Sequence, residues 1–489
     1  MLTCKTRDNK KNMKNYFRKV AFGIGPNEEI PSDPLKWALN QLDDVPDLAW
    51  KGRIHSEKEM REKYSREWRV EEMKLRKKFK DNKTLYKTNK DLLRHKTGQK
   101  FWESLELSIR HTEAIQSNSP VLAKLWFFWA NHFAIVDKDF LPRYHTGPYQ
   151  RESIRLNLNQ TFEKLVYDAT TSWAMIRNLD NSDNEGPKSK DAKSEWRRKK
   201  KRPATINENH ARELLELHTV SPAAGYTQDD ITQLAYIMTG WRLGWSKTTD
   251  DTKKVEFARE VHQPGKKTVF GKTYKSGKKG LALVIKDLVN HPNCRDFIAT
   301  KLCRHLITDE PTDEMKKPII KAFKDSDGFL PEIHKAAIKV AFEYNDQYKK
   351  FQNPENWFIQ MSKLSDFNWP PSPKVMDLYE LGNKPQSIHR QPEWKLNDLG
   401  HNPYRAAQPN GFSDLAIDWI SPELLIRRLV YAKDTYELTK SENNNLEFYE
   451  KIVNKNFDNP EKILKYLEKT NKLYEKQILL FNHPEFLRA

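Results

Sequence analysis

The segment VLAKLWFFWANHFAI, residues 121–135, constrains the fold more than any other part of the chain. As a helix it is apolar almost all round, so it has to be surrounded by other protein. Ser119 and Pro120 immediately before it form a helix-start pattern, because Ser caps helices and Pro is tolerated in the first turn. The most apolar stretch, residues 125–136, is too short to cross a bilayer, which takes roughly 20 residues. The segment therefore predicts a central, buried helix inside a larger assembly of helices.

Most of the remaining chain also predicts helices. Residues 32–42 begin with Ser32 or Asp33 as the cap and Pro34 in the first turn. Residues 56–80 are densely charged but keep large apolar side chains at roughly helical spacing, which indicates one long, exposed helix. Further helices are expected at residues 148–168, 205–218, 227–240 and 293–307, and again in the C-terminal part, residues 331–489, where Pro-rich loops join them.

Two of these helices carry a capping-box pattern, in which a Thr is followed three positions later by an acidic residue. The pairs are Thr205 with Glu208 and Thr227 with Asp230. The only plausible strand region is residues 255–274, whose Gly and β-branched content is typical of an irregular hairpin. We therefore predict an all-α class, a multi-helix globular bundle with at most a small β-hairpin.

A basic segment interrupts this pattern. Residues 182–204 change abruptly to Lys, Arg, Ser, Asp and Glu, with the run RRKKKR at 197–202. Because the segment offers almost nothing to bury, we predict a flexible, disordered basic insertion. Strong helical patterns resume on both sides, so it is not a domain boundary, and without internal repeats we expect one domain over residues 1–489 with its motifs in about 16–488.

Charge and cysteine content narrow the partners and the compartment. The net charge of +18 favours polyanions such as nucleic acid, anionic lipid or an acidic polymer, although a solvated basic surface is the simpler interpretation. Cys4, Cys294 and Cys303 contain no C-x-x-C pair, which argues against a disulfide framework or a structural zinc site. The first residues are polar and basic, so neither a secretory signal nor a membrane anchor is visible. We expect a reducing, cytoplasmic compartment.

The segment NENHARELLELHT, residues 207–219, is the richest in ionisable groups. Glu213 and Glu216 are one turn apart on a helix, where two carboxylates can jointly hold a metal ion or share a proton. His218 lies on another side, so a metal ion needs a ligand from elsewhere. His132 is the first candidate, because a buried imidazole is costly to leave without a partner. A divalent metal ion at His132, Glu213 and Glu216 is therefore a candidate cofactor.

The same segment has a purely structural interpretation. Glu208 can complete a capping box, Arg212 can pair with Glu208 or Glu216, and Arg151 and Arg155 can neutralise the other carboxylates. A buried ion network that fixes helix register needs no substrate. A noncatalytic ligand pocket is a third possibility.

Weaker patterns occur elsewhere. His262 and His305 are the next candidate metal ligands, although His305 with Lys301 is also typical of a polar helix face. The tripeptide at 409–411, Pro-Asn-Gly, indicates a turn. The sequence contains no Gly-x-Ser-x-Gly motif, P-loop or dinucleotide fingerprint.

The motifs in combination resemble the domain of unknown function 1800 family, nearly end to end. They are, in order, FRKVAFGIGP with ALNQL, WFFWANHF, YQRESIR, NLDNSDNEGP, NENHARELLELHT, GYTQDDITQLAYIMTGWRLG, HQPGKKTVFG, NHPNCRDFIATKLCRHLITDEP, QPNGFSDLAIDW and HPEFLRA. The resemblance implies a helical fold and no established reaction. Members often carry export signals and are commonly encoded beside a sulfatase-like partner, which implies work on extracellular or envelope polymers. This chain departs from that pattern in showing no signal, and His210 stands where members usually have an aromatic or apolar residue.

Carried over position by position, the resemblance nominates a set of site-lining residues. They are Asn131, His132, Arg151, Arg155, Asp180, Asn207, Glu208, Arg212, Glu213, Glu216, His218, Thr239, Trp241 and His262. The leading hypothesis is a hydrolase in which Glu213 or Glu216 is the general base or a metal ligand. His132 and His218 assist, and Arg151, Arg155 and Arg212 hold an anionic substrate group. The alternative is a noncatalytic binding or scaffold protein for nucleic acid or another polyanion, with the basic run at 197–202 as its contact.

Overall fold

The central helix predicted from residues 121–135 is the buried helix α7 (Pro120–His132). The computed structural model describes residues 13–96, 99–244, 254–368, 392–439 and 445–489. Every residue of α7 except Asn131 is buried. Pro120 occupies the first turn as expected, although the Ser119 side chain makes no capping hydrogen bond. The prediction of a fully enclosed helix is confirmed, and the one residue that escapes full burial lies at the candidate site.

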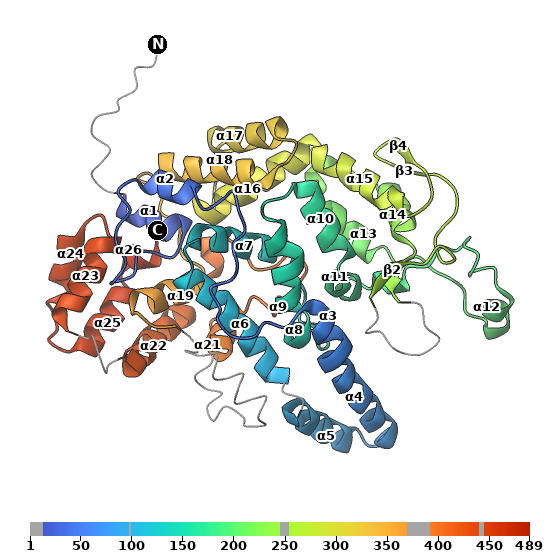
Figure 1. Ribbon diagram of the computed structural model, residues 1–489, viewed down its shortest axis with the longest axis horizontal. Coiled ribbons are helices and arrows are strands. Elements are labelled where there is room, and N and C mark those ends of the chain that lie inside the picture. Colours follow the sequence, from blue (N-terminus) through green and yellow to red (C-terminus); the bar gives the residue numbers. More distant parts are fainter. Residues whose placement is uncertain (1–12, 97–98, 245–253, 369–391, 440–444) are drawn as a thin grey trace, which may run out of the picture.

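Helices surround α7 on all sides (Figure 1). Those from the first part of the chain are α1 (Lys14–Val20), α2 (Pro34–Leu39), α3 (Glu57–Glu59), α4 (Arg66–Lys78), α5 (Lys83–Lys96), α6 (Gln99–Gln116), α8 (Leu141–Tyr144), α9 (Thr146–Tyr149), α10 (Phe162–Thr171) and α11 (Trp173–Asn178). Those from the middle are α12 (Glu195–Lys200), α13 (Asn209–Glu216), α14 (Gln228–Met238), α15 (Lys279–Asn290), α16 (Pro292–Leu306), α17 (Asp313–Asp325), α18 (Leu330–Glu343) and α19 (Pro354–Leu364). The last group is α21 (Pro392–Asp398), α22 (Pro422–Thr439), α23 (Leu446–Asn456), α24 (Pro460–Leu467), α25 (Leu473–Phe481) and α26 (Pro484–Leu487).

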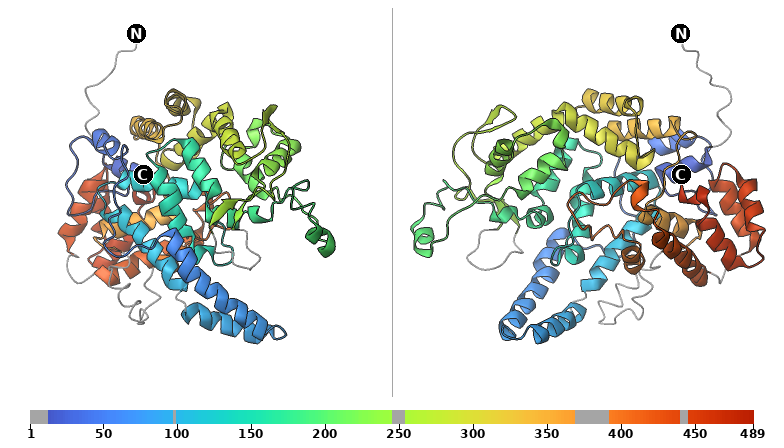
Figure 2. Two further views of the ribbon diagram at one scale, coloured as in Figure 1. Left: turned by 45° about the vertical axis from the view of Figure 1, so that its right-hand side comes forward. Right: turned by 180° about the vertical axis from the view of Figure 1, so that it is seen from behind.

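The apolar interior forms two clusters. The larger one surrounds α7 and extends through α10, α14, α16 and α18. The smaller one joins α19 to the C-terminal helices α22–α26, which lie at one end of the molecule, opposite α12 (Figures 1 and 2). None of the described helices combines the length and the apolar character that a bilayer crossing needs.

The strands form two small antiparallel sheets, which is consistent with the predicted all-α class. In one, β1 (Trp241–Leu243) pairs with β2 (Val255–Phe257). In the other, β3 (Lys267–Val269) pairs with β4 (Lys272–Tyr274) through a two-residue turn. Phe270 and Gly271 in that turn both have positive φ, of 48° and 71°, which is the geometry that lets two strands reverse tightly. The predicted hairpin in residues 255–274 is therefore β3–β4, and the pairing of β2 with β1 is additional.

Two predicted helix starts differ in outcome. Thr227 and Asp230 form the expected capping box at α14. Thr205 and Glu208 do not, and the helix predicted to begin at 205 begins at Asn209. Residues 205–207 instead run alongside residues 184–185: the Glu185 N–H donates to the Thr205 carbonyl over 2.9 Å and the Asn207 N–H to Asn184 Oδ1 over 3.1 Å. Long-range pairing has outweighed the local capping pattern here.

The continuous helix predicted at residues 148–168 is wrong. The chain passes through a π-helical turn at Gln150–Ile154 and a short 3-10 turn, and α10 starts only after Thr161, whose side chain accepts the Lys164 N–H. Asn157 donates from its side chain to the Ser153 carbonyl over 2.9 Å, and such local bonds compete with the backbone ladder of a helix. The helix predicted at 56–80 has nearly the expected extent, as α3, a π-helical turn at Met60–Ser65, and α4.

The segment predicted as a disordered basic insertion has defined local structure in the described chain. It contains helix α12, and Arg197 from its basic run is buried between Glu185 and Asp191. The expectation that the run had nothing to bury is therefore wrong at Arg197, because two carboxylates inside the same segment supply its partners. The flexibility of this segment in solution stays a prediction.

Helix α1 meets the C-terminal residues at a buried arginine. The Arg18 guanidinium donates to the carbonyls of Phe486, at 3.0 Å, and Arg488, at 2.9 Å, so α1 is bonded to the closing segment. That closing segment in turn exchanges backbone hydrogen bonds with Lys350 and Gln352, just before α19. The chain end thus holds the start of α19, where two residues of the candidate site are located.

Helix α6 carries a stripe of buried charges. Glu103, Glu106, Arg110 and Glu113 are at most 5% exposed. Each pairs with a partner from a distant segment: Glu103 with Arg405, Glu106 with Arg151, Arg110 with Glu355, and Glu113 with Arg155. Buried ion pairs of this kind add little net stability but fix which segments lie side by side, because removing one partner leaves a buried charge.

We expect Arg151→Met to destabilise the protein by about 3–5 kcal/mol, because it leaves Glu106 buried and unpaired. The double variant Arg151→Met/Glu106→Met should recover most of that loss, since it removes both charges at similar volume. Urea unfolding of the two single variants and the double variant gives the coupling energy. An unchanged stability in Arg151→Met would contradict a structural role for the pair.

Candidate functional site

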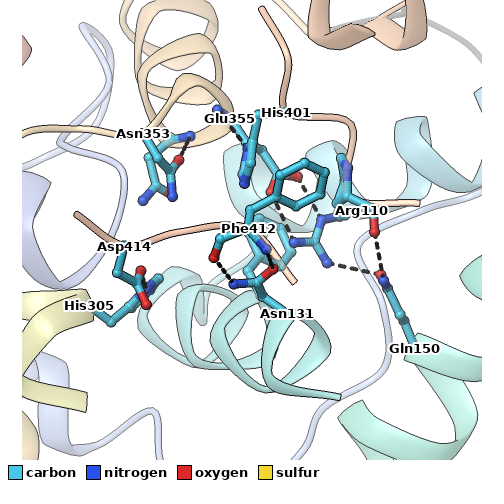
Figure 3. A pocket seen from close by; sticks show the side chains of 12 residues that line it. Arg110, Asn131, Gln150, His305, Asn353, Glu355, His401, Phe412 and Asp414 are labelled. Atoms are coloured by element: carbon cyan, nitrogen blue, oxygen red, sulfur yellow. Dashed lines mark hydrogen bonds and ion pairs between the residues drawn. The ribbon is translucent and has the colours of Figure 1, made fainter. Parts of the chain in front are cut away.

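The candidate site is a small enclosed cavity of about 20 Å³ beside the C-terminal end of α7. A cavity of this size holds about one water molecule. Its lining comes from six separate parts of the chain and is mostly polar (Figure 3). The lining residues are Arg110, Phe127, Asn131, Gln150, His305, Asn353, Glu355, Asn356, His401, Pro403, Phe412 and Asp414.

His305 and Asp414 form a hydrogen-bonded pair in this lining. His305 Nδ1 lies 2.9 Å from Asp414 Oδ1, and both side chains are largely buried. Burial alone would raise the pKa of Asp414, but the charges of His305 and Lys350 outweigh it and lower that pKa below its ordinary value. An ionised carboxylate can only accept, so Nδ1 carries a hydrogen, and in the neutral form of the imidazole Nε2 has the lone pair. Nε2 is buried and has no hydrogen-bond partner among the described residues.

Asn131 fixes the loop that carries Asp414. Its amide donates to the Phe412 carbonyl over 2.8 Å and accepts the Phe412 N–H over 2.8 Å, so one side chain satisfies both backbone groups. Gly411 has a φ of 72°, and a Cβ at that position would overlap the backbone oxygen of Asn131. The turn predicted at 409–411 therefore requires glycine because the chain passes directly over α7.

Further bonds hold the same loop from the other side. Lys350 Nζ donates to the Asp414 carbonyl and to Asp309, and Asp309 also accepts the Ala416 N–H over 2.7 Å. The Trp419 indole donates to the Ser413 carbonyl over 2.9 Å. The backbone groups of Phe412, Ser413, Asp414 and Ala416 are thus each held by a side chain from outside the loop, as expected of a loop that positions functional groups.

The opposite wall of the cavity is an ion pair. Arg110 bonds Glu355 through Nε at 2.7 Å and through Nη2 at 3.0 Å, and its Nη1 donates to Gln150 Oε1 at 3.1 Å. Burial would raise the pKa of Glu355, but Arg110 outweighs it and holds that pKa far below its usual range. The charges of Arg110 and Glu355 neutralise each other, so the pair forms a polar wall of the cavity but provides no unpaired charge there.

The remaining polar groups complete the upper wall. Asn353 Oδ1 caps α19 by accepting the Asn356 N–H, which leaves the Asn353 NH₂ to donate to a guest. His401 Nδ1 accepts the Glu355 N–H over 3.3 Å, and the imidazole packs edge-on against Phe412 with the ring centres 4.3 Å apart. Burial lowers the pKa of His401 to about 4, so its ring is neutral at physiological pH.

The structure places His132 and His218 together but in the core. His132 Nε2 donates to the His218 carbonyl over 3.2 Å, and the two ring centres are 6.1 Å apart. Both side chains are 1% exposed. Burial lowers the pKa of His132 well below its ordinary value and that of His218 to about 3. Neither imidazole has a carboxylate partner among the described residues, so neither is equipped to carry a proton.

The carboxylates of α13 lie at a half-buried surface. Burial and the neighbouring Glu216 raise the pKa of Glu213, and Glu216 accepts the Tyr226 hydroxyl over 3.3 Å. Glu208 accepts from Thr232 and Gln228, and its ion pair with Arg212 spans 3.6 Å. The alternative pairing of Arg212 with Glu208 is therefore confirmed.

Arg151 and Arg155 do not reach α13. They pair with Glu106 and Glu113 of α6, at 2.8 Å and 3.0 Å. The expectation that they neutralise the α13 carboxylates is wrong, because the carboxylates of α6 already satisfy them inside the core. Each arginine is engaged in a buried ion pair, so it is not placed to bind a substrate anion.

The other nominated residues hold backbone together. Lys138 pairs with Asp180, which has a positive φ of 55°. Asn207 lies against the same turn, and its side chain reaches the Asp180 carbonyl at 3.5 Å. His262 Nδ1 donates to the Thr239 carbonyl over 2.7 Å, next to β1, where Trp241 begins the strand.

The nominated residues therefore do not meet at one site. Among the described residues, no group of three or more His, Cys, Asp or Glu side chains is placed to hold a metal ion, so His132, Glu213 and Glu216 form no such cluster. Of the nominated set, Asn131 lines the cavity, together with His305, a secondary candidate.

Several cavity residues gave no functional signal in the sequence. Asp414 lies in QPNGFSDLAIDW, a motif of the family resemblance that nominated no site residue and indicated only a turn. Glu355 follows an Asn-Pro helix start, whose capping role already explains that pattern. Arg110 looks like an ordinary polar residue of an amphipathic helix. These residues could be identified as site residues only from the contact between their three segments, which the sequence does not show.

Fold and cavity together define a mostly helical protein with an enclosed polar cavity built around a buried His–Asp pair. The family model for the protein of unknown function DUF1800 matches residues 16–488, and the chain belongs to that family. No curated protein and no solved structure matches the chain.

His210 offers a test of how buried imidazoles affect stability. It is 1% exposed, neither ring nitrogen has a hydrogen-bond partner in the part of the chain that the structure describes, and burial lowers its pKa to about 3. We expect His210→Leu to stabilise the protein by about 1 kcal/mol at pH 7.5, because two unpaired polar atoms are removed. Below pH 6.5, His210 of the unfolded wild type binds a proton, whereas the buried imidazole of the folded state stays neutral. The stability of His210→Leu relative to the wild type should therefore increase by about 1.4 kcal/mol per pH unit towards pH 3.

His334 provides the matched control. It is equally buried, but its Nε2 accepts the Trp129 indole N–H over 2.8 Å. His334→Leu should destabilise the protein by about 1–3 kcal/mol at pH 7.5, because the indole is left unpaired. Thermal unfolding of both variants at pH 7.5 and 5.0 separates the effects, and a destabilised His210→Leu at both pH values would contradict the assignment.

Proposed function

We propose that the protein is a hydrolase in which His305, oriented by Asp414, acts as the general base. The observation that carries the proposal is the buried Nε2 of His305, which has no hydrogen-bond partner among the described residues and carries the lone pair when the imidazole is neutral. A base held in one tautomer by a carboxylate is the arrangement that proton abstraction requires. The sequence-based hydrolase hypothesis is thereby kept, with His305 and Asp414 in place of Glu213 and His132.

The proposed step is the activation of one water molecule. A cavity of about 20 Å³ has room for that water, and the Asn353 amide is available to hold it. Nε2 takes a proton as the water oxygen bonds to the electrophilic centre of the substrate, and Asp414 stabilises the imidazolium that forms. The bond between that centre and the leaving group then breaks, and the imidazolium gives its proton to the departing group, which returns His305 to its neutral form. No step of the proposal needs a metal ion. Phe412 forms one wall of the cavity, so the substrate has to approach past this side chain.

Hydrolysis of a small substrate panel tests the proposal. The panel comprises the 4-nitrophenyl acetate, phosphate, sulfate and glycoside, so that anionic and neutral groups are compared. We expect His305→Gln and Asp414→Asn each to lower kcat/KM for the accepted substrate by about 10²-fold or more, because the base or its tautomer is lost. His291→Asn on the same helix, which keeps a capping side chain, should change it by less than about twofold.

A second measurement does not depend on the substrate. The ¹⁵N spectrum of labelled histidine, assigned with His305→Gln, should show His305 as the Nδ1–H tautomer, and Asp414→Asn should abolish that preference. An Nε2–H tautomer in the wild type, or full activity in His305→Gln, would overturn the proposal.

Metal content addresses the earlier hypothesis separately. Elemental analysis of the purified protein that found a stoichiometric divalent ion, lost in Glu213→Gln and in His132→Ala, would restore a metal-dependent site at α13. The second candidate function, a noncatalytic scaffold for a polyanion, is favoured by the exposed cations that follow Arg197. It concerns the surface and not the cavity, so both functions can be tested on one preparation.

A further inference from the structure

Helix α12 lies at the tip of a projection on one end of the molecule (Figures 1 and 2). The Trp196 side chain there is 55% exposed, although a tryptophan is normally mostly buried. Five cations around it are exposed as well: Arg198, Lys199, Lys200, Lys201 and Arg202. We refer to residues 195–202 as the α12 tip.

The α12 tip is anchored at its base. Arg197, the one buried cation of the run, lies 2.7 Å from Glu185 and 2.5 Å from Asp191. Ser194 caps the helix by accepting the Arg197 N–H, and Lys201 ends it in the left-handed conformation. The ion pairs of Arg197 thus hold the α12 tip against residues 185–191, whereas the cations at 198–202 are exposed to solvent.

The charge of the tip is almost uncompensated. Lys199 pairs with Glu195 over 2.8 Å, and no ion pair to any described residue occupies the other four exposed cations. A surface with five cations, one anion and a large aromatic side chain fits a polyanion that also offers an apolar layer. Charge complementarity therefore limits the partner to anionic polymers and anionic membranes.

We propose that the α12 tip docks the protein on the surface of an anionic phospholipid bilayer, with Trp196 at the level of the headgroups. Clusters of four to eight Lys and Arg residues bind anionic lipid surfaces, and tryptophan prefers the membrane–water interface. Sites for single-stranded nucleic acid instead follow the backbone along a charged groove. The α12 tip is a projection, so its shape favours a flat membrane surface.

The affinity of such a contact depends on salt and on lipid charge. Each Lys or Arg near an anionic surface contributes about fivefold to binding at low salt. Screening shortens the range of that attraction from about 10 Å at 0.1 M salt to about 3 Å at 1 M. Binding through this tip should therefore be strong at low ionic strength and nearly absent at high ionic strength.

Co-sedimentation of the full chain with large unilamellar vesicles tests the proposal. The vesicles contain phosphatidylcholine alone or a 7:3 mixture with phosphatidylserine, at 50 mM and 500 mM salt. We expect binding only to the mixed vesicles and only at low salt. The test variant carries Arg198→Gln, Lys199→Gln, Lys200→Gln, Lys201→Gln and Arg202→Gln, and should bind at least tenfold more weakly.

A matched variant controls for net charge. It removes the same number of exposed cations at the turn between α4 and α5, with Lys77→Gln, Lys78→Gln, Lys80→Gln, Lys83→Gln and Lys87→Gln. This variant should bind within about threefold of the wild type. Trp196→Ala should weaken binding severalfold without changing its salt dependence.

Three results would overturn the proposal. One is equal binding to neutral and mixed vesicles, and another is an equal loss in the α12-tip variant and in the matched control. The third is a preference for nucleic acid: a single-stranded oligonucleotide that binds the wild type at 50 mM salt and loses that binding in the α12-tip variant, without any vesicle binding, assigns the tip to nucleic acid.

Discussion

The buried ion pair between Arg110 and Glu355 holds together the parts of the molecule on which the candidate site depends. It joins α6 to the first turn of α19, two segments that are far apart in the sequence. The guanidinium also stacks on Phe127 of the central helix, with 3.5 Å between its carbon and the ring centre. Because neither charge can be left unpaired in the interior, α6, α7 and α19 have to meet at this point, and the cavity forms where they meet.

The other charges of α6 extend the same constraint along its length. The three carboxylates of the stripe bind Arg405, Arg151 and Arg155. Together with the pair of Arg110 and Glu355, one helix therefore determines where three distant parts of the chain lie. This explains why the chain between α9 and α10 is irregular. Arg151 and Arg155 reach α6 at two separate points; Arg151 lies within the π-helical turn and Arg155 directly follows it. Polar pairing inside the core has determined the backbone path there more strongly than helical propensity has.

Structural features that depend on one segment of the chain could be predicted from the sequence. Features that depend on a contact between two distant segments could not. The enclosure of α7, the start of α2 at Asp33 and the capping box of α14 follow from local patterns, and the structure contains all three. The capping box at Thr205 failed because a contact with residues 184–185 was stronger. An ion pair between distant segments leaves no period in the sequence, so Arg110, Glu355 and Asp414 could not be recognised as neighbours from composition or spacing.

The contrast between His132 and His305 shows what separates a core imidazole from a candidate base. Both are buried, and the sequence favoured His132 because it lies on the most apolar helix. A proton acceptor, however, has to survive as a cation, and a buried imidazolium is tolerated only beside an opposite charge. His132 contacts the His218 carbonyl and the aromatic rings of Trp129 and Phe133, and burial lowers its pKa. His305 has Asp414, which comes from a loop 109 residues further along the chain. In the proposed mechanism the placement of that carboxylate decides which imidazole can act as the base, and the bonds from Asn131 and Lys350 hold the loop that carries it.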